Sequence, residues 1–387
     1  MASYILRRLL LVIPTLFGIM VVNFTLTQFV PGGPIQQVLA RIDGGGDAFQ
    51  AISGGGDAGV TEPGSEGTGG NGGYIGAKGL PPEFIDRLEV QFGFARFVCA
   101  KDFAGEPSAK AAECQKEMIP MVERFFIMMG KYVTFDFGES YFRSIGVLDL
   151  VWEKMPVSIS LGLWSTLIAY LISIPLGIRK ALRDGSRFDT WTSGIIIAAY
   201  AIPGLLFAIM LLVLFAGGSY FQWFPLRGLT SSNWESLSLF GKITDYFWHM
   251  TLPIIASTIS SFATMTLLTK NSFLDEIKKQ YVLTARAKGL SEARVLYGHV
   301  FRNAMLIVIA GFPGLFLGVL FGGSLIIETI FSLDGLGRMG YEATVARDYP
   351  IMFGNLFFFG LIGLVVGILS DLTYALVDPR IDFEKRG

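Results

Sequence analysis

Few side chains in this sequence have the types and spacing that catalysis or metal binding needs. The 387 residues include two His and two Cys, and no arrangement of these supplies the three or four ligands of a zinc site. The phosphate-binding pattern G-x-x-x-x-G-K-[ST] does not occur, so the chain has no P-loop with which to bind and hydrolyse ATP. We therefore expect no enzyme, no metal site and no cofactor in this chain.

One basic, amphipathic segment stands out, the stretch TARAKGLSEARVLYGHVFRNA at 284–304. A helical pattern over 271–288 is followed by Gly289, which favours a left-handed helix stop. Ser291, with Glu292 behind it, is typical of a new N-cap. The pattern predicts a helix, a sharp elbow and a second, short helix.

The second helix is expected to extend to about residue 301. One face would contain Val295, Leu296 and His299, with Arg294 and Arg302 beside it. Such a helix could lie on the inner leaflet with its basic residues on lipid headgroups. A lipid-surface helix needs no stiff elbow, however, and this one is short and weakly apolar, so insertion into a groove of another protein is favoured.

The elements that must position this segment are membrane helices. The sequence is 52% hydrophobic and 16% charged, with a mean hydropathy of +0.53, which is typical of lipid-embedded proteins. The net charge of −1 and the short basic clusters give no continuous basic face for nucleic acid. Membrane lipid is the expected surrounding.

Six nearly uncharged windows are long enough to cross about 30 Å of hydrocarbon at about 1.5 Å per residue. None alternates like a barrel strand, and backbone in lipid must satisfy its own hydrogen bonds, so each is predicted to be a helix. The predicted fold is an all-α bundle of six transmembrane helices at residues 9–30, 157–178, 194–217, 250–269, 304–327 and 351–370.

Basic residues predict the orientation of these helices. With the N-terminus inside, sixteen fall on the inner side: Arg7, Arg8, Arg179, Lys180, Arg183, Arg187, Lys270, Lys278, Lys279, Arg286, Lys288, Arg294, Arg302, Arg380, Lys385 and Arg386. The short outer loops contain four: Arg227, Lys242, Arg338 and Arg347. Both termini are therefore expected in the cytoplasm. The first window is too long for the apolar region of a cleaved signal peptide, and five spans follow it.

We divide the chain into an N-terminal tail with the first helix (1–30), an extracytoplasmic segment (31–156) and a five-helix core (157–387) that contains a cytoplasmic loop at 270–303. Within the outer segment, a Gly-rich tract at 44–73 is expected to be a flexible coil. Apolar spacing after Pro81 and over about 118–133 predicts helices. These would form a small extracytoplasmic cap.

Cys99 and Cys114 both fall in this outer segment. An extracytoplasmic compartment is oxidising, so a disulfide between them is the favoured interpretation. It would close a loop of about 16 residues and contribute about 3 kcal/mol. The alternative is two unpaired thiols.

No predicted span has an acidic or basic residue at its centre, where one would cost roughly 2.5 to 3.5 kcal/mol and indicate an ion or proton relay. Glu328, Asp371 and His249 lie at helix ends, where anchoring by local hydrogen bonds is favoured over gating or substrate contact. An ion-driven carrier is thereby disfavoured.

Polar and small residues mark two further faces. In the fourth span Ser257, Ser261 and Thr264 share a face, which either lines a path for a polar substrate or hydrogen-bonds to neighbouring helices. In the fifth span the stripe of Gly314, Gly318 and Gly322 permits a close helix contact, within this chain or with another. Prolines at 14, 175, 203, 253 and 313 predict kinks or boundaries.

Several motifs resemble those of permease subunits of ATP-binding-cassette (ABC) importers, of the dipeptide, oligopeptide and nickel permease family. The resemblance covers the chain outside 41–78 and 98–116. Its motifs are YILRRLLLVIPTLFGIMVVNF followed by FVPGGP, FDFGES, HMTLP, ARAKG, GLGRMGYEATVARDYP and DPRID. The Gly-rich outer segment and the run SRFDTWTSG resemble the Yej-type peptide importers within this family.

This resemblance implies the type I importer permease fold, and a coupling helix that docks on an ATPase subunit. The implied coupling segment contains Ala285, Arg286, Ala287, Gly289, Ser291, Glu292, Arg294, Val295, Leu296, His299 and Arg302. The general signature of such permeases opens with Glu-Ala-Ala, whereas Leu283, Thr284 and Ala285 stand here. A specific role for that Glu is therefore not carried over.

The resemblance also implies a function in the bacterial inner membrane: import of oligopeptides or peptide-like compounds such as microcin C. The implied partners are a second homologous permease, a periplasmic peptide-binding protein, and ATPase subunits that use ATP and Mg, either as two chains or as one chain with two nucleotide-binding domains. Two rival interpretations are an ion-gradient-driven secondary transporter and a non-transporting membrane scaffold.

Overall fold

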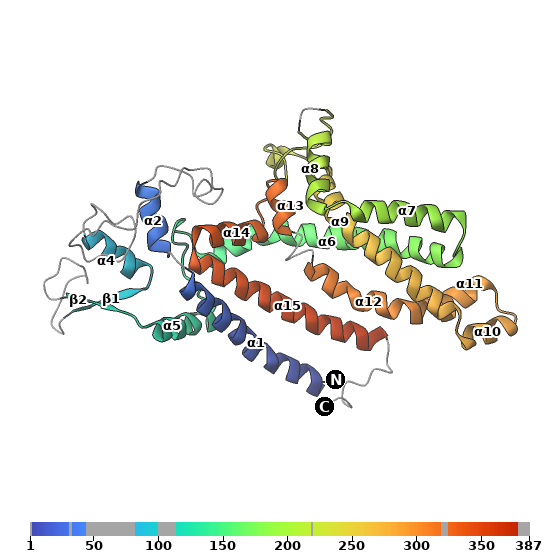
Figure 1. Cartoon of the computed structure of the whole chain (residues 1–387), viewed down its shortest axis with the longest axis horizontal. Helices are drawn as coiled ribbons and strands as arrows, with labels where there is room; N and C mark the ends of the chain where they lie inside the picture. The colour runs from blue at the N-terminus through green and yellow to red at the C-terminus, as the bar shows by residue number, and fades with distance from the viewer. Residues whose placement is uncertain are drawn as a thin grey trace, which may run out of the picture. The chain divides into compact units, whose positions relative to one another are not determined.

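A computed structural model describes residues 2–30, 33–43, 82–99, 114–217, 220–318 and 324–377 (Figure 1). The Gly-rich tract at 44–73, Gly322 and the DPRID motif lie outside these residues. The described elements are α1 (Ala2–Phe29), α2 (Pro34–Asp43), α4 (Pro82–Gln91), β1 (Ala95–Cys99), β2 (Cys114–Met118), α5 (Met121–Val133), α6 (Val147–Leu182), α7 (Arg187–Ala201), α8 (Gly204–Phe215), η1 (Trp234–Ser236), α9 (Leu239–Ile277), α10 (Gln280–Ala287), α11 (Glu292–Val295), η2 (Leu296–Val300), α12 (Phe301–Gly318), α13 (Ser324–Ile330), α14 (Leu336–Ala346) and α15 (Tyr349–Val377).

The chain forms two compact units. The first comprises residues 1–16, 151–341 and 358–387, and the second comprises 17–150 and 342–357. The predicted helical architecture is confirmed, with one small hairpin that the sequence patterns did not indicate.

Four helical stretches in the described residues are long and apolar enough to cross a membrane, at 5–29, 147–182, 292–317 and 349–373. The count rises to six if each of two bent helix pairs is one span. Both pairs fall at the third and fourth predicted windows, so all six windows have a helical counterpart.

The third predicted span is broken rather than continuous. Helix α7 ends at Ala201 and α8 begins at Gly204, with a bend of 92° between them. The cause is local, because Pro203 pushes the residue before it out of the helical region, and Ile202 accordingly has ψ 121°. The other four marked prolines lie inside helices without ending them.

Helices α6 and α9 approach each other closely at one point, Gly177. A Cβ atom added to Gly177 of α6 would lie 2.6 Å from Cβ of Thr269 and 2.9 Å from the carbonyl oxygen of Thr266, both on α9. Nearby, Ser173 donates a hydrogen bond to the carbonyl of Phe262 (3.2 Å). Small and hydroxyl side chains thus hold these membrane helices together where apolar packing gives little preference.

The Gly stripe of the fifth span does not make the corresponding contact at Gly314. A Cβ atom there would meet nothing within 4 Å in the described part of the chain. A close helix contact is made instead at Gly177 of α6, a position that the Gly stripe of the fifth span did not indicate.

In the second unit, α2 and α4 pack through a small apolar cluster. Ile35 and Leu39 of α2 meet Leu88 of α4 and the following Phe92, which confirms the helix predicted after Pro81. The second predicted outer helix begins later than expected, at Met121, because residues 114–118 pair as a strand instead.

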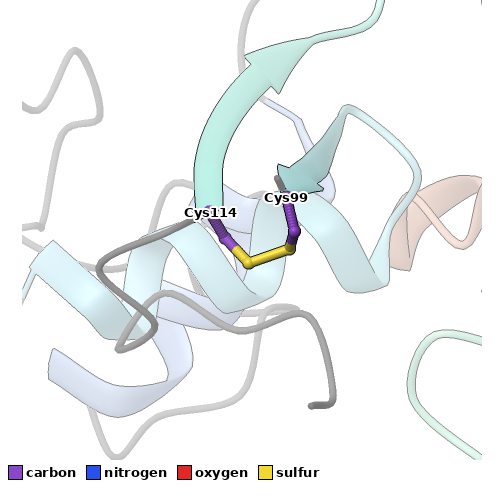
Figure 2. The surroundings of a disulfide bond; sticks show 2 residues. All are labelled: Cys99 and Cys114. Carbon is purple, nitrogen blue, oxygen red and sulfur yellow. A yellow bond between two sulfur atoms is a disulfide. The ribbon is translucent and has the colours of Figure 1, made fainter. Parts of the chain in front are cut away.

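The two strands form an antiparallel hairpin in which Cys99 lies opposite Cys114. Their sulfur atoms are bonded (Figure 2). The bond links the last residue of β1 to the first residue of β2 and so closes the intervening loop at its base.

Two of the family-like motifs meet within the second unit. From FDFGES, Ser140 donates a hydrogen bond to Oδ2 of Asp348 (2.5 Å), and the backbone N–H of Tyr141 donates to Oδ1 of the same Asp (3.2 Å). Asp348 belongs to ARDYP and is 2% exposed. These motifs therefore fix the local chain path.

Candidate functional site

The segment predicted to lie in the cytoplasm and to couple to a partner is built from α10, α11 and η2, which connect α9 to α12. In Figure 1 α10 and α11 lie together beyond the ends of α9 and α12. The expected continuous helix over 271–288 is wrong: α9 ends at Ile277 and α10 begins at Gln280. Lys279 between them is extended (ψ 151°). This break lets Val282 and Ala285 pack into a core with Ile178 of α6 and Phe273 of α9.

The elbow, residues 288–291, has the geometry expected from Gly289. Its φ is +80°, a left-handed conformation that favours glycine. The Gly289 N–H donates to the carbonyl of Arg286 (2.9 Å), and the Leu290 N–H donates to that of Ala285 (3.4 Å). These two bonds are the pair that defines a Schellman helix end.

An ion pair crosses the elbow from one helix to the next. Nε and Nη2 of Arg286 donate to the two carboxylate oxygens of Glu292 at 2.9 and 3.0 Å. Such a two-point contact fixes orientation as well as distance. Ser291 occupies the N-cap position of α11, but its side chain makes no capping hydrogen bond.

The expected apolar face of the second helix is wrong. Val295 and Leu296 are buried, and together with Val300 they join the core that contains Phe273 of α9. His299 points elsewhere and is exposed. The reason is that the helix does not stop near residue 301 but continues through the π turn η2 into α12, so its apolar side belongs to the chain's own bundle.

The exposed face of the segment is a different set. Leu283 and Tyr297 are large and apolar yet 56% and 63% exposed, and the exposed Arg294 and His299 lie on the same short stretch as Tyr297. We call the exposed residues Leu283, Arg294, Tyr297 and His299 together the elbow face, a name for this set that does not place all four on one side of a helix. Sequence spacing alone did not identify Tyr297, because the burial of its neighbour Leu296 is known only from the structure.

The start of the coupling segment is tied to the bundle by a hydrogen-bonded chain of three side chains. Asn303 Nδ2 donates to Tyr281 Oη (3.2 Å), which donates to Oε1 of the buried Glu276 (3.0 Å). Burial raises the pKa of the Tyr281 phenol. The hydrogen-bonded ion pair with Glu276 raises the pKa of Lys279, which therefore stays charged. The start of α10 is thereby linked to α9 and α12.

The polar face expected in the fourth span lies on α9. Ser257 donates to the carbonyl of Pro253 (2.8 Å) and is half-buried, as is Ser261, whereas Thr264 is exposed. That these residues line a substrate path, the alternative to hydrogen bonding with neighbouring helices, stays a prediction. A second polar set on α9, with Thr266 and Thr269, faces α6 instead.

The three ionisable residues that were expected at helix ends have local partners, although the expectation is wrong for His249, which lies inside α9 because that helix begins already at Leu239. Glu328 is fully buried and accepts hydrogen bonds from Ser158 Oγ (2.6 Å) and from the backbone N–H of Arg338 (2.7 Å) at the start of α14. His249 Nδ1 lies 2.9 Å from the carbonyl oxygen of Asp245 on the preceding turn. Asp371 pairs with Arg8 (2.9 Å). These contacts are those of anchoring groups.

The second unit contains a cavity of about 540 Å³ near the motif contact of Ser140 and Asp348. Eight of its 22 lining residues are aromatic, and Arg124, Lys131, Asp136 and Glu139 add charge. Among the described residues, no group of three or more His, Cys, Asp or Glu side chains is placed to hold a metal ion.

Comparison with known proteins agrees with the motifs. The family model described as "Binding-protein-dependent transport system inner membrane component" matches residues 173–383. The chain is 59% identical to the "Peptidoglycan transport system permease protein YejB" of Agrobacterium fabrum and 54% identical to the "Inner membrane ABC transporter permease protein YejB" of Escherichia coli O157:H7. Each alignment covers 100% of this chain and 100% of the relative. It is 29% identical to the "Oligopeptide transport system permease protein AppB" of Bacillus subtilis, over 99% of this chain and 100% of that one.

The predicted resemblance is confirmed, including its Yej-type character. ATP hydrolysis in such importers belongs to separate subunits, so this chain is not itself the enzyme. Membership also implies a second permease and ATPase partners. The chain belongs to the family of binding-protein-dependent transport system inner membrane components, the membrane-spanning permeases of ABC importers.

Proposed function

We propose that this chain is one of two permeases of an inner-membrane importer that moves peptides or peptide-like compounds into the cytoplasm. The cargo class is supported by relatives that are named as oligopeptide and dipeptide permeases. Microcin C is one peptide-like candidate. A peptidoglycan fragment is a second, supported by the name of the 59% identical relative.

The proposed complex contains this chain, a homologous permease, two nucleotide-binding domains on one or two ATPase chains, and a periplasmic binding protein that delivers cargo. ATP and Mg are used by the ATPase subunits. Both termini of this chain face the cytoplasm, which is supported by the excess of basic residues in the loops on that side.

The observation that carries this proposal is the form of the elbow face. A segment braced by the Gly289 stop, the ion pair of Arg286 with Glu292 and the chain from Asn303 to Glu276 presents exposed Leu283, Tyr297 and Arg294. Aromatic and Arg side chains on a rigid support are typical anchors of protein interfaces. ATP-driven closure of the nucleotide-binding domains would then move the elbow and shift the bundle between two states.

Co-purification tests this proposal against both rivals. An ATPase subunit with a P-loop should come down with the chain in fixed ratio, and the double change of Arg294→Glu and Tyr297→Ala should weaken its retention by about 30-fold or more, as loss of interface anchors does. Arg183→Glu, on the same predicted side but outside the elbow, is the matched control and should retain the ATPase.

Each rival predicts a different outcome. An ion-driven carrier would take up cargo in liposomes from this chain alone, with an ion gradient and no ATP. A scaffold would give no cargo-dependent ATPase activity in any reconstituted complex. Either result contradicts the proposal.

The two cargo classes are separated by competition in proteoliposomes that contain the complete importer. An unlabelled peptidoglycan-derived muropeptide and an unlabelled oligopeptide are each added against a labelled oligopeptide. Equal displacement by both supports a broad peptide site, whereas no uptake of the labelled oligopeptide, together with uptake of a labelled muropeptide, assigns the cargo to cell-wall fragments.

A further inference from the structure

The run SRFDTWTSG, residues 186–194, folds around a buried lysine at the inner end of α6. Lys180 is 0% exposed, and its ammonium group donates to the carbonyl of Asp189 (2.9 Å) and to the hydroxyls of Thr192 (2.8 Å) and Ser193 (2.7 Å). Oδ1 of Asp189 lies 3.0 Å from the same ammonium group. Every one of these acceptors comes from the first turns of α7, so this part of the cluster joins α6 to α7.

The second carboxylate oxygen of Asp189 connects the cluster to a third helix. Lys270 of α9 lies 2.7 Å from Oδ2 of Asp189 and 2.8 Å from Oδ1 of Asp184. The Lys270 side chain is 14% exposed and the Asp189 side chain 8%. We call Lys180, Asp184, Asp189 and Lys270 the inner ion cluster.

The position of Lys270 relates the cluster to the elbow. Lys270 lies on the last two turns of α9, and α10 begins at Gln280. The residue before it, Thr269, makes the close approach to Gly177 of α6. The inner end of α9 is therefore fixed to α6 by backbone proximity and to α7 by charge, immediately before the chain enters the coupling segment.

Electrostatics gives this arrangement a mechanical consequence. Membrane helices lack a hydrophobic force between them, so apolar contacts alone let one helix slide along another. A desolvated ion pair with further hydrogen bonds resists such sliding, because separating its partners leaves uncompensated buried charge. A push on the elbow would reach α9 first and then, through Lys270, the helices α6 and α7.

We propose that Lys270 and Asp189 are positioning residues that transmit movement of the coupling segment to the second and third membrane spans. The inference rests on the proposed function, since it presumes that the elbow is driven by an ATPase. It assigns a role to the SRFDTWTSG run, which docking of the elbow does not explain.

The test uses the complete importer in proteoliposomes and measures peptide transported per ATP hydrolysed. Lys270→Gln removes the charge that bridges α9 to α7 and leaves the contacts of Lys180 in place. We expect the complex to assemble and to hydrolyse ATP, while transport per ATP falls by about tenfold, within the range of coupling between sites. Lys270→Arg keeps the charge and should restore the ratio.

Lys242→Gln is the matched control, because it removes the same charge from the opposite end of α9, where Lys242 lies 3.5 Å from the exposed carboxylate of Glu235. It should leave the ratio unchanged. An unchanged ratio in Lys270→Gln overturns the inference. So does a parallel loss of transport and ATPase activity together with a lowered unfolding temperature, which would indicate a structural role alone.

Failure of the proposed function is distinguishable from failure of this inference. If the unaltered complex transports without ATP, or no ATPase subunit binds it, the proposed function fails. If the unaltered complex is ATP-driven and Lys270→Gln is equally well coupled, the inference alone fails.

Discussion

Replacing Gly289 with Val perturbs the elbow through its backbone. Gly289 has φ +80°, and a Cβ atom there would meet nothing within 4 Å, so no steric clash contributes. The cost of placing an L-residue in the left-handed region is about 1–2 kcal/mol, and a β-branched side chain is among the least tolerant. That free energy lowers the population of the elbow conformation, relative to its alternatives, by a factor of about 5–30.

The assay compares transport and ATP hydrolysis in proteoliposomes that contain the complete importer. Because the bonds from Gly289 and Leu290 hold the angle between α10 and α11, we expect Gly289→Val to assemble but to transport less peptide per ATP. Gly289→Asn should keep most activity, since Asn tolerates this conformation. Gly93→Val, at another left-handed glycine with open surroundings (φ +75°) but in the outer segment, controls for strain alone.

The reasoning fails if Gly289→Val leaves both transport and ATPase activity unchanged. It also fails if Gly93→Val lowers transport per ATP as strongly, because the effect would then not depend on the elbow.

Three further changes test the packing around the site and the outer segment. Cys99→Ser opens the loop that the bond to Cys114 closes and should destabilise the second unit by about 3 kcal/mol. Limited proteolysis of the outer segment would detect this loss, with a surface Ser→Ala change as the control. Gly177→Val forces α6 away from Thr269 and should lower the unfolding temperature, with an overpacking cost of about 1–3 kcal/mol; an unchanged temperature would contradict the close approach. Tyr281→Phe removes the hydroxyl between α9 and α12 and should cost about 1–2 kcal/mol, measured by thermal unfolding, and should lower coupling less than the Gly289 change.

Features with a local cause were predictable from the sequence. Gly289 forms the left-handed stop because that conformation depends on the residue type and its place after a helix. Membrane-length helices follow from the absence of charge over about 20 residues, and the break before α8 follows from Pro203. The helix containing Leu88 was found from its apolar spacing.

Features that depend on tertiary contacts were not predictable in the same way. Val295 and Leu296 form an apolar face in the sequence, but whether it meets this chain or a partner depends on the π turn that continues into α12. The pairing of residues 114–118 with β1 was missed because a short polar strand has no apolar alternation.

The inner ion cluster illustrates the same limit. Lys180 and Lys270 were counted as basic residues of the inner side. Nothing in their spacing indicated that both meet Asp189, because Lys180 is nine residues from Asp189 in the sequence and Lys270 is 81 residues from it. The signal that could have directed attention to Asp189 is the polar run that surrounds it.

The most direct test of the central claim is a density map of the assembled importer, determined without nucleotide and with a non-hydrolysable ATP analogue. We expect α10 and α11 to lie in a groove of an ATPase subunit in both states, with Tyr297 and Arg294 at the contact. We also expect both helices to move with that subunit. Density that shows this segment in solvent or flat on the lipid surface in both states would contradict the claim.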